Sequence, residues 1–225
     1  MREMIGRTLE ISAVLMGLLL IWPVFLLIAL LIVVSSPGPV LFTQTRVGRH
    51  GKPFTIYKFR SMVPGADKLG SSVTTGDDAR ITPVGRFLRR TKLDELPQLW
   101  NVLVGDMSLV GPRPEVPEIV AHYTPSMRRI LEVRPGITSI ASLHLRDEED
   151  LLAALDDPDR AYVASLVPFK VSLAMTHVDQ RSIWFNVRVL ILTLYGVLLG
   201  WWRPLGEPHD VTKFKKYILL DSKNE

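Results

Sequence analysis

Two adjacent carboxylates, Asp94 and Glu95, are the side chains of this chain best suited to chemistry. Pro97 follows them, and proline is tolerated in a helix only in the first turn, so the pair is predicted at or just before a helix start. A helix start lowers carboxyl pKa values through the helix dipole and the free N–H groups. Because an ionised carboxylate can attack phosphorus, the pair is a candidate for phosphoryl transfer.

Cationic side chains flank the pair on both sides. A basic cluster of Arg86, Arg89, Arg90 and Lys92 lies upstream, and a Gly-Pro-Arg-Pro turn lies downstream at residues 111–114. Arginine binds phosphate through a planar fork, which makes Arg89 and Arg113 candidates for a diphosphate clamp. Residues i and i+2 of a strand share a face, so Lys58 and Arg60 would extend this basic wall. The candidate substrate-binding residues are Lys58, Arg60, Arg89, Pro112, Arg113 and Pro114.

A divalent cation is compatible with the carboxylate pair. Adjacent helical residues point about 100° apart, so Asp94 can attack phosphorus while Glu95 holds a metal ion, or the reverse. Mg²⁺ suits this arrangement because it takes one or two carboxylates plus substrate phosphate oxygens. The residues alone leave plainer interpretations open: the pair can be a helix cap, the basic run can face lipid, and residues 111–114 can be only a turn.

The chain contains no cysteine, which excludes disulfides, zinc-thiolate sites and thiol nucleophiles, and its five histidines show no paired metal spacing. Residues 1–113 hold 14 of the 27 Lys/Arg but 8 of the 23 Asp/Glu. This basic half favours anionic lipid headgroups or phosphorylated substrates as partners. No basic motif interleaved with aromatic residues indicates nucleic acid.

The N-terminal segment indicates a membrane location. Residues 11–34 form a run of 24 residues without a charge, and as a helix of about 36 Å this run would cross a hydrocarbon core of about 30 Å. It exceeds the apolar region of about 7–15 residues in a cleaved signal peptide. Pro23 interrupts the run, and basic residues lie on both flanks. A helix that bends at Pro23 and returns to its starting face would keep both flanks in the cytoplasm; a kinked single span stays equally open.

The remaining elements follow from periodicity and turn residues. Strands are predicted at 40–44 and 55–59 around a turn at 48–52, then a surface loop at 63–78 and a helix at 82–90. The helix from Asp94 carries an apolar stripe of Leu93, Leu96, Trp100 and Leu103. Further helices are predicted at 115–122, 148–155 and 160–175, with acidic clusters at 147–150 and 156–159 as solvated ends or turns. Residues 183–202 are favoured as an interfacial helix, with a buried core helix or a second span as alternatives.

These motifs together resemble the monotopic phosphoglycosyl transferases, the bacterial sugar transferase family. The matching segments are RVG at 46–48, YKFRSM at 57–62, TPVGRFLRR at 82–90, LDELPQLWNVL at 93–103, GDMSLVGPRPE at 105–115 and RPGIT at 134–138; similarity continues weakly through Tyr162, Pro168 and Lys170. The chain departs from the family at residues 138–143, at Asn186, and at Trp22, where the family has a serine before the proline of its re-entrant helix.

The resemblance implies transfer of a phospho-sugar from a UDP-sugar to undecaprenyl (polyprenol) phosphate, with release of UMP, as a first step of bacterial glycan assembly. It assigns Asp94 as the nucleophile that forms a covalent phospho-sugar intermediate and Glu95 as its partner near Mg²⁺. It assigns nucleotide or phosphate binding to Arg89 and Arg113. The family's re-entrant helix makes Pro23 the break in the membrane segment.

The expected fold is α+β, mostly α with short β segments. Residues 1–36 would form a re-entrant membrane hairpin, 37–182 a cytoplasmic catalytic domain, and 183–225 an interfacial helix with a basic tail. The expected location is the bacterial inner membrane, and the expected partners are a UDP-sugar, undecaprenyl phosphate and membrane lipids, with no nucleic acid. The sugar and the oligomeric state, a homodimer included, stay open.

Overall fold

The computed structural model describes residues 2–198 except 67, 68, 70–73, 75–77, 146, 147 and 181. In chain order the helices and strands are α1 (Arg2–Ser35), β1 (Leu41–Val47), β2 (Pro53–Phe59), α2 (Pro83–Thr91), α3 (Gln98–Val104), β3 (Ser108–Val110), α4 (Pro117–Ala121), β4 (Gly136–Thr138), α5 (Ile140–His144), α6 (Glu148–Ala153), α7 (Pro158–Ala161), α8 (Val167–Asp179) and α9 (Ile183–Leu198). The chain is mostly helical with short strands, as predicted. Trp201, Trp202, the basic tail, Asp147 and much of the predicted loop at 63–78 lie outside the described residues.

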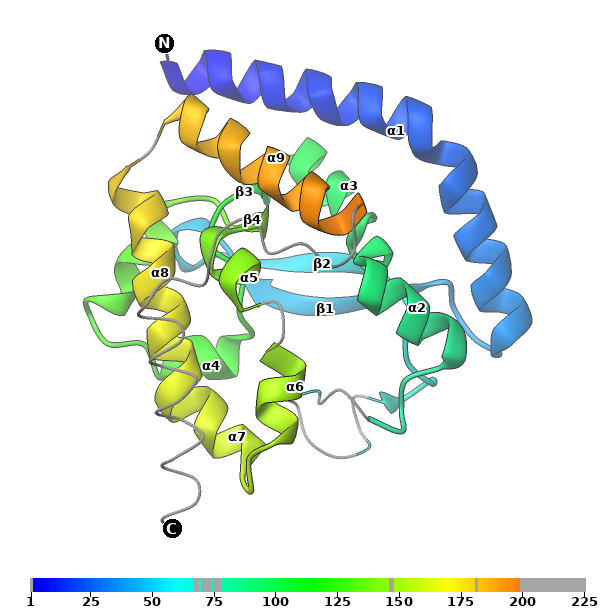
Figure 1. Cartoon of the computed structure of the whole chain (residues 1–225). Coiled ribbons are helices and arrows are strands. Elements are labelled where there is room, and N and C mark those ends of the chain that lie inside the picture. Colours follow the sequence, from blue (N-terminus) through cyan, green and yellow to red (C-terminus); the bar gives the residue numbers. More distant parts are fainter. Residues whose placement is uncertain are drawn as a thin grey trace.

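The long N-terminal helix α1 lies along one side of the molecule and changes direction partway along its length (Figure 1). Pro23 is the proline inside it, and a proline removes one backbone hydrogen bond and clashes with the preceding turn. The helix is nevertheless continuous through Pro23, and its bend fits both the re-entrant hairpin and the kinked single span that the sequence leaves open.

Two helical stretches of the described chain have the length and composition to cross a membrane, Ile5–Ser35 and Pro158–Asp179. The first has a mean hydropathy of 3.0 and leaves most of its side chains uncovered, whereas the second has a mean hydropathy of 1.2 and is more deeply buried. The second stretch places Leu166, Val167 and Val171 in the core. It is therefore a core helix of the body of the protein, by which we mean β1 to α8.

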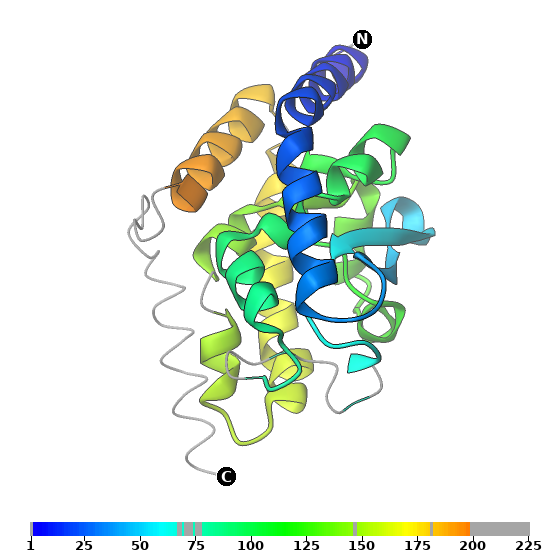
Figure 2. The same ribbon diagram turned by 90° about the vertical axis from the view of Figure 1, so that its right-hand side faces the viewer.

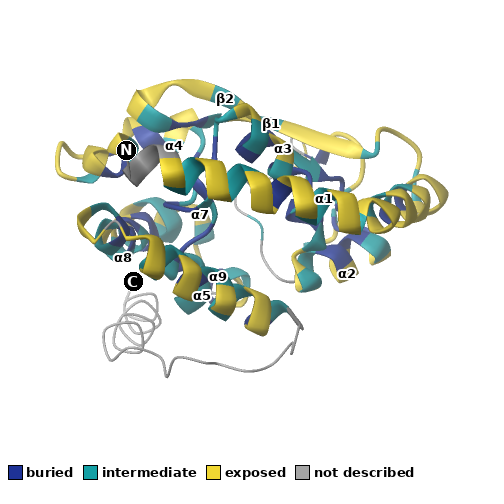
Figure 3. Cartoon of the chain, turned by 90° about the horizontal axis from the view of Figure 1, so that it is seen from above, coloured by how far each residue is buried: buried dark blue, intermediate teal, exposed yellow. Residues whose placement is uncertain are grey.

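An uncovered apolar face runs over α1 and α9. Seen from above, the two helices lie on the same face and carry exposed residues along their lengths (Figure 3). Large exposed side chains on α1 include Leu15, Met16, Leu19, Leu20, Trp22, Leu26, Leu27 and Leu30, and those on α9 include Trp184, Val187, Ile191, Leu194 and Tyr195. A soluble protein rarely leaves so large an apolar area open to water, so this face indicates contact with lipid or with another protein.

Two small sheets organise the body. β1 and β2 form an antiparallel hairpin in the predicted place, with Leu41 opposite Phe59 and Val47 opposite Pro53. The strands are longer than predicted because the turn between them is a short 3₁₀ segment, Arg49–Gly51, in which His50 has a φ of 59°. The second sheet pairs β3 with β4 in parallel.

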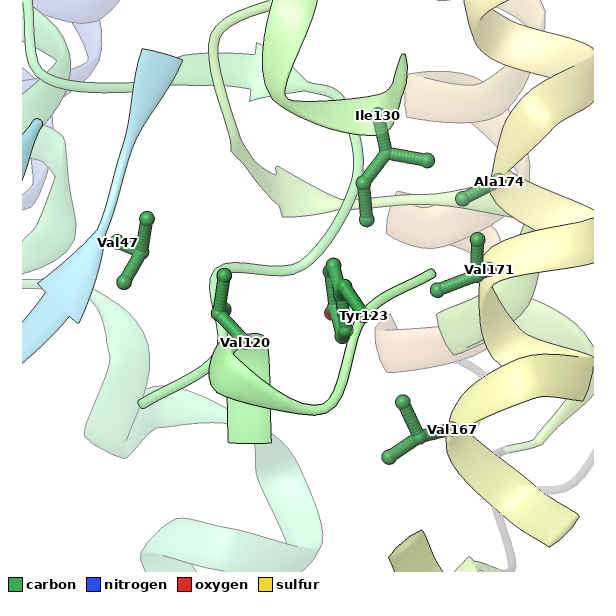
Figure 4. Close-up of a cluster of buried hydrophobic side chains, with 7 residues drawn as sticks. All are labelled: Val47, Val120, Tyr123, Ile130, Val167, Val171 and Ala174. Atoms are coloured by element: carbon green, nitrogen blue, oxygen red, sulfur yellow. The ribbon is translucent and has the colours of Figure 1, made fainter. Parts of the chain in front are cut away.

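The main core cluster joins elements that lie far apart in the sequence. Figure 4 shows its side chains coming from β1, from α4 and the loop after it, from the 3₁₀ segment Met127–Glu132, and from α8. Its buried members are Val47, Val120, Tyr123, Ile130, Val167, Val171 and Ala174. A second cluster under α6 and α7 contains Leu145, Leu151, Leu152, Leu155 and Leu166. The burial of these side chains holds α8 against the other elements of the body. Figure 2 shows α8 behind other elements of the body, on the side away from α1.

The helix after Asp94 buries polar as well as apolar residues. Of the predicted apolar stripe, Leu93, Leu96 and Leu103 pack against buried clusters, whereas Trp100 is 56% exposed. The buried residues of α3 are instead Gln98, Asn101 and Val102. Asn101 is buried because it serves β2: its Oδ1 accepts the Tyr57 N–H at 3.2 Å, and its Nδ2 donates to the Thr55 carbonyl at 2.7 Å. A polar side chain that completes a strand hydrogen-bond pattern has taken an interior position.

Other predicted helices are present with shifted ends. α2 begins where predicted, with Thr82 accepting the Gly85 N–H as an N-cap at 2.9 Å. The predicted helix at 160–175 is part of a longer one in which a π-helical turn, Tyr162–Leu166, separates α7 from α8. Pro168 follows that turn. Since proline lacks an N–H to donate, the local hydrogen-bond pattern must change there.

Candidate active site

Asp94 and Glu95 lie in a single 3₁₀ turn, Leu93–Glu95, between α2 and α3. Lys92 ends α2 in the left-handed conformation, with a φ of 58°, and turns the chain sharply into this segment. Pro97 is the N-cap of α3, which confirms the prediction that the pair lies just before a helix start. Both carboxylates are buried, at 4% and 7% exposure. A helix cap at the surface would not need this burial, so the pair has the environment of a functional site.

Glu95 is held by two cations. Arg113 donates to both of its oxygens, from Nη2 to Oε1 at 2.5 Å and from Nη1 to Oε2 at 3.2 Å. Lys58 Nζ donates to Oε1 at 3.0 Å. Burial by itself would raise the pKa of Glu95, but Arg113 and Lys58 outweigh it and hold this pKa well below its usual range. Glu95 is therefore a fixed, ionised carboxylate.

Asp94 has a contrasting environment. Its Oδ1 is buried and has no hydrogen-bond partner within the described part of the chain. Burial and then the neighbouring Glu95 charge raise the pKa of Asp94, against the opposing influence of Lys58, Lys92 and Arg89. The surroundings push the two pKa values apart, which is the arrangement by which paired carboxylates acquire different roles. An ionised Asp94 has an unshared oxygen free to act.

The Gly-Pro-Arg-Pro turn presents Arg113 from the end of β3. The Gly111 N–H donates to the Thr138 carbonyl at 3.0 Å, and the Gly136 N–H donates to the Pro112 carbonyl at 2.8 Å. The two backbones approach so closely that a Cβ on Gly136 would lie 2.0 Å from the Gly111 nitrogen. Pro112 and Pro114 fix the turn from within and line a small pocket behind it. Arg113 is thereby aimed at Glu95 by backbone that has little freedom.

The other two predicted cationic residues, Arg89 and Arg60, lie in different parts of the structure. Arg89 Nη2 lies 2.5 Å from Glu149 Oε1, and its charge still acts on Asp94. Arg60 instead donates to the carbonyls of Ser36 and Pro37, each at 2.8 Å, and ties the end of α1 to the body. The structure thus brings Lys58, Arg89 and Arg113 around the carboxylates, whereas Arg60 contacts the segment directly after α1.

A second buried charge network lies behind the turn and was missed by the sequence reasoning. Lys170 Nζ lies 3.2 Å from Glu115 Oε1 and 3.1 Å from Glu148 Oε1. The Tyr162 hydroxyl donates to Glu115 at 2.8 Å, and Arg46 Nη1 lies 3.6 Å from Glu115 Oε2. Glu115 directly follows the proline turn, which is the signal that would have found it.

The acidic cluster at the start of α6 is part of these contacts. The cluster forms the start of α6, as predicted for a helix end, but Glu148 and Glu149 each also pair with a basic residue of another element. The cluster at 156–159 does behave as a helix start, because the Asp157 side chain accepts the Arg160 N–H at 3.0 Å. α6 therefore supplies the carboxylates that pair with Arg89 and Lys170.

The residues present fit a magnesium site that substrate completes. Within the described ranges, no group of three or more His, Cys, Asp or Glu side chains gathers to hold a metal alone. Mg²⁺ typically takes one or two carboxylates plus phosphate oxygens, and the unpartnered buried Oδ1 of Asp94 is a suitable hard ligand. Glu95 Oε1 is already bound by both Arg113 and Lys58, so Oε2, with its single Arg113 contact, is the Glu95 oxygen that could reach a metal ion.

Comparisons with known proteins agree with the motifs of the site. Residues 1–200 match the family described as bacterial sugar transferase. A UDP-glucose:undecaprenyl-phosphate glucose-1-phosphate transferase of Escherichia coli is 41% identical over 86% of this chain and 40% of its own length. The galactosyl transferase CpsE of Streptococcus agalactiae is 37% identical over 86% of this chain and 42% of its length.

A third relative acts on another sugar. The UDP-N-acetylgalactosamine-undecaprenyl-phosphate N-acetylgalactosaminephosphotransferase of Aeromonas hydrophila is 36% identical over 87% of this chain and 44% of its length. The chain therefore spans about two fifths of the length of these three relatives. Their names share the undecaprenyl phosphate acceptor in two cases and differ in the sugar.

Proposed function

This chain belongs to the bacterial sugar transferase family, and we propose that it transfers a sugar 1-phosphate from a UDP-sugar to undecaprenyl phosphate at a membrane surface. The observation that carries the proposal is the asymmetry of the carboxylate pair. Glu95 has both oxygens bound by cations, while Asp94 keeps a buried oxygen that has no partner among the residues the structure describes. One carboxylate is thus fixed in place, and its neighbour is available to react.

The reaction proceeds in two displacements at the phosphorus that carries the sugar. Asp94 attacks this phosphorus, the bond to the bridging oxygen breaks, and UMP leaves with the bonding electron pair. The product is an acyl phosphate that joins Asp94 to the phospho-sugar. The terminal oxygen of undecaprenyl phosphate then attacks the same phosphorus, and the Asp94 carboxylate leaves. The products are UMP and undecaprenyl diphosphate-sugar, and the enzyme returns to its first state.

The cations have distinct parts in this scheme. Arg113 and Lys58 hold Glu95 in its ionised form and place its charge next to Asp94. Arg89 faces the diphosphate by exchanging its contact with Glu149 for a phosphate oxygen, because a bidentate arginine–phosphate contact is the stronger partner for a half-exposed side chain. Mg²⁺ bound by Asp94 and Glu95 would neutralise the diphosphate and polarise its phosphoryl oxygens.

We also infer that α1 enters the membrane and returns to the face it came from. At one end, Arg7 donates to the Met107 carbonyl at 3.2 Å, and Glu10 accepts the Leu109 N–H at 2.6 Å. At the other end, Arg60 binds the carbonyls of Ser36 and Pro37. Both ends of the apolar helix are therefore bound to one body, and a body on one side of a bilayer cannot hold both ends of a helix that crosses it.

The location that fits these contacts is the cytoplasmic face of the bacterial inner membrane. Basic residues flank both ends of α1, as the positive-inside tendency requires of cytoplasmic segments. α9 leaves an apolar row uncovered on the same face of the molecule (Figure 3). We assign α9 to the headgroup layer, where Trp184 and Tyr195 have both an apolar and a polar surrounding.

The chemistry is tested with purified protein, a panel of UDP-sugars and undecaprenyl phosphate, by UMP release and by transfer of labelled sugar phosphate to protein. Asp94→Asn should lower turnover by roughly 10³-fold or more and abolish the protein label. Asp156→Asn, which alters an exposed aspartate, is the matched control. Retained turnover in Asp94→Asn would sink the covalent mechanism, and wild-type protein that releases no UMP from any UDP-sugar would sink the function.

The topology has its own experiment, which the absence of native cysteine makes clean. Single cysteines at positions 2 and 52 are labelled with a membrane-impermeant reagent in right-side-out and inside-out vesicles. We expect both positions to react only in inside-out vesicles. Labelling of the two positions from opposite faces rules out the hairpin.

A further inference from the structure

The first turns of α1 carry an ion pair that faces the body of the protein. Arg7 Nη1 lies 2.7 Å from Glu10 Oε2, and each side chain is 17% exposed. Residues 11–34, which follow, are uncharged. The pair thus lies in the polar N-terminal part of a helix that is apolar from residue 11 onward, and its contacts attach that helix to the body of the protein.

Arg7 binds the far end of the helix that follows the carboxylate pair. Its Nη2 donates to the Val102 carbonyl, and its Nη1 donates to the Met107 carbonyl at 3.2 Å. Val102 lies in the last turn of α3, where its carbonyl also accepts the Gly105 N–H at 3.2 Å and the helix dipole favours a cation. Arg7 therefore caps α3, whose other end joins the turn that carries Asp94 and Glu95.

Glu10 binds the strand that leads to Arg113. Its Oε1 accepts the Leu109 N–H at 2.6 Å, and its Oε2 accepts the Ser108 hydroxyl at 3.3 Å. β3 ends at Val110, and the Gly-Pro-Arg-Pro turn begins at the next residue. One ion pair of the membrane helix thus binds both segments that bring Glu95 and Arg113 together.

We propose that Arg7 and Glu10 are positioning residues, which make the geometry of the Glu95–Arg113 contact depend on the seating of the membrane helix. Neither touches the reacting groups; they act through α3 and β3. This inference rests on the proposed function for its catalytic consequence. Displacements of about 1 Å at a catalytic group cost up to about 100-fold in rate, so loosening either segment should lower kcat far more than substrate binding.

The test compares Arg7→Met, Glu10→Gln and the charge swap Arg7→Glu/Glu10→Arg in the full chain. We expect each single variant to lower kcat by about tenfold and to leave the UDP-sugar KM within about twofold. The swap should not recover activity, because an arginine at position 10 cannot accept the Leu109 N–H and a glutamate at position 7 cannot donate to the Val102 carbonyl. Arg128→Met, at an exposed arginine, controls for loss of charge.

Amide hydrogen exchange separates this inference from the proposed activity. In Arg7→Met, the amides of residues 93–95 and of Gly111 should exchange about tenfold faster than in the wild type. Within the described part of the chain, none of these amides is hydrogen-bonded to Arg7. Unchanged exchange at these amides overturns the inference, as does wild-type kcat in both single variants. Recovery of kcat by the charge swap also overturns it, since the pair would then act only through its own ion pair and not through its contacts with α3 and β3. Wild-type protein without UDP-sugar turnover counts against the proposed function alone.

Discussion

Replacing Lys170 with methionine should destabilise the protein more than any loss of a surface charge. The lysine Nζ lies 3.2 Å from Glu115 Oε1, 3.1 Å from Glu148 Oε1 and 3.0 Å from the Tyr162 hydroxyl. Its side chain is 11% exposed and that of Glu115 is 8% exposed. Methionine retains most of the apolar stem, so the substitution removes charge and hydrogen bonds with little change in packing.

The magnitude follows from what remains around Glu115. Removing one partner of a buried ion pair costs about 3–5 kcal/mol, because the other charge is left without compensation. Arg46, at 3.6 Å, and the Tyr162 hydroxyl, at 2.8 Å, still contact Glu115. We therefore expect the free energy of unfolding to fall by about 3 kcal/mol, the lower end of this range. For a protein of this size, that loss corresponds to a Tm about 6–12 °C lower.

The effect should depend on pH with a defined sign. Burial would raise the pKa of Glu115, but Lys170 and Arg46 outweigh burial and lower it. A group with a lowered folded-state pKa stabilises the fold above its unfolded pKa of about 4.3 and loses that contribution as pH falls through the folded value. The difference between wild type and Lys170→Met should therefore be full at pH 7 and shrink below about pH 4.3.

The assay is thermal unfolding in detergent, followed by the near-ultraviolet signal of the aromatic residues. Lys52→Met, which alters an exposed lysine, is the matched control and should leave Tm unchanged. Lys170→Met/Glu115→Gln should recover much of the loss, because it removes the stranded charge together with its partner. A Tm of Lys170→Met equal to that of the control, or a double variant less stable than Lys170→Met, would refute the reasoning.

Three further outcomes follow from the site. The acid limb of the rate profile should lie above the ordinary aspartate pKa of about 3.9, because burial and Glu95 raise the pKa of Asp94; a limb at or below that value contradicts the assignment. Glu149→Gln should lower the UDP-sugar KM by up to about fivefold, since it frees Arg89 from a half-exposed pair; an unchanged or raised KM counts against the exchange of partners. Gly136→Ala should lower the free energy of unfolding by about 3 kcal/mol, because its Cβ would meet the Gly111 backbone. Gly17→Ala, with open space around it, is its control, and equal effects in a denaturant titration would contradict the close approach.

Local signals in the sequence predicted those parts of the fold that local chemistry determines. Thr82 and Pro83 predicted the start of α2, and Pro97 predicted the start of α3, because caps and proline positions act within one turn. The hairpin of β1 and β2 was predicted for the same reason, from alternation around a short turn. The burial of Asn101 in place of Trp100 was not predicted, since helical periodicity does not reveal that Asn101 is needed inside to complete hydrogen bonds of β2.

The partners of the site residues were beyond sequence reasoning. Arg89 and Glu149 are 60 positions apart, and Glu115 and Lys170 are 55 apart. Which cation meets which carboxylate is decided by the packing of α6 and α8 against the body, through the buried clusters under those helices. Spacing identified the residue types and the chemistry of Asp94 and Glu95; the fold determined that Arg113 and Lys58 meet Glu95.

The charge balance of the site leads to a requirement of the proposed reaction for additional positive charge. Four cations, Lys58, Arg89, Lys92 and Arg113, act on a neighbourhood that already holds the carboxylates of Asp94 and Glu95. Lys58 and Arg113 are paired with Glu95, and Arg89 is paired with Glu149. In the proposed reaction, an incoming diphosphate would add at least two negative charges beside an Asp94 that must itself be ionised. Because buried like charges repel strongly, this state needs more positive charge than the free side chains supply. In the proposed mechanism, a divalent cation that arrives with the diphosphate would meet that need.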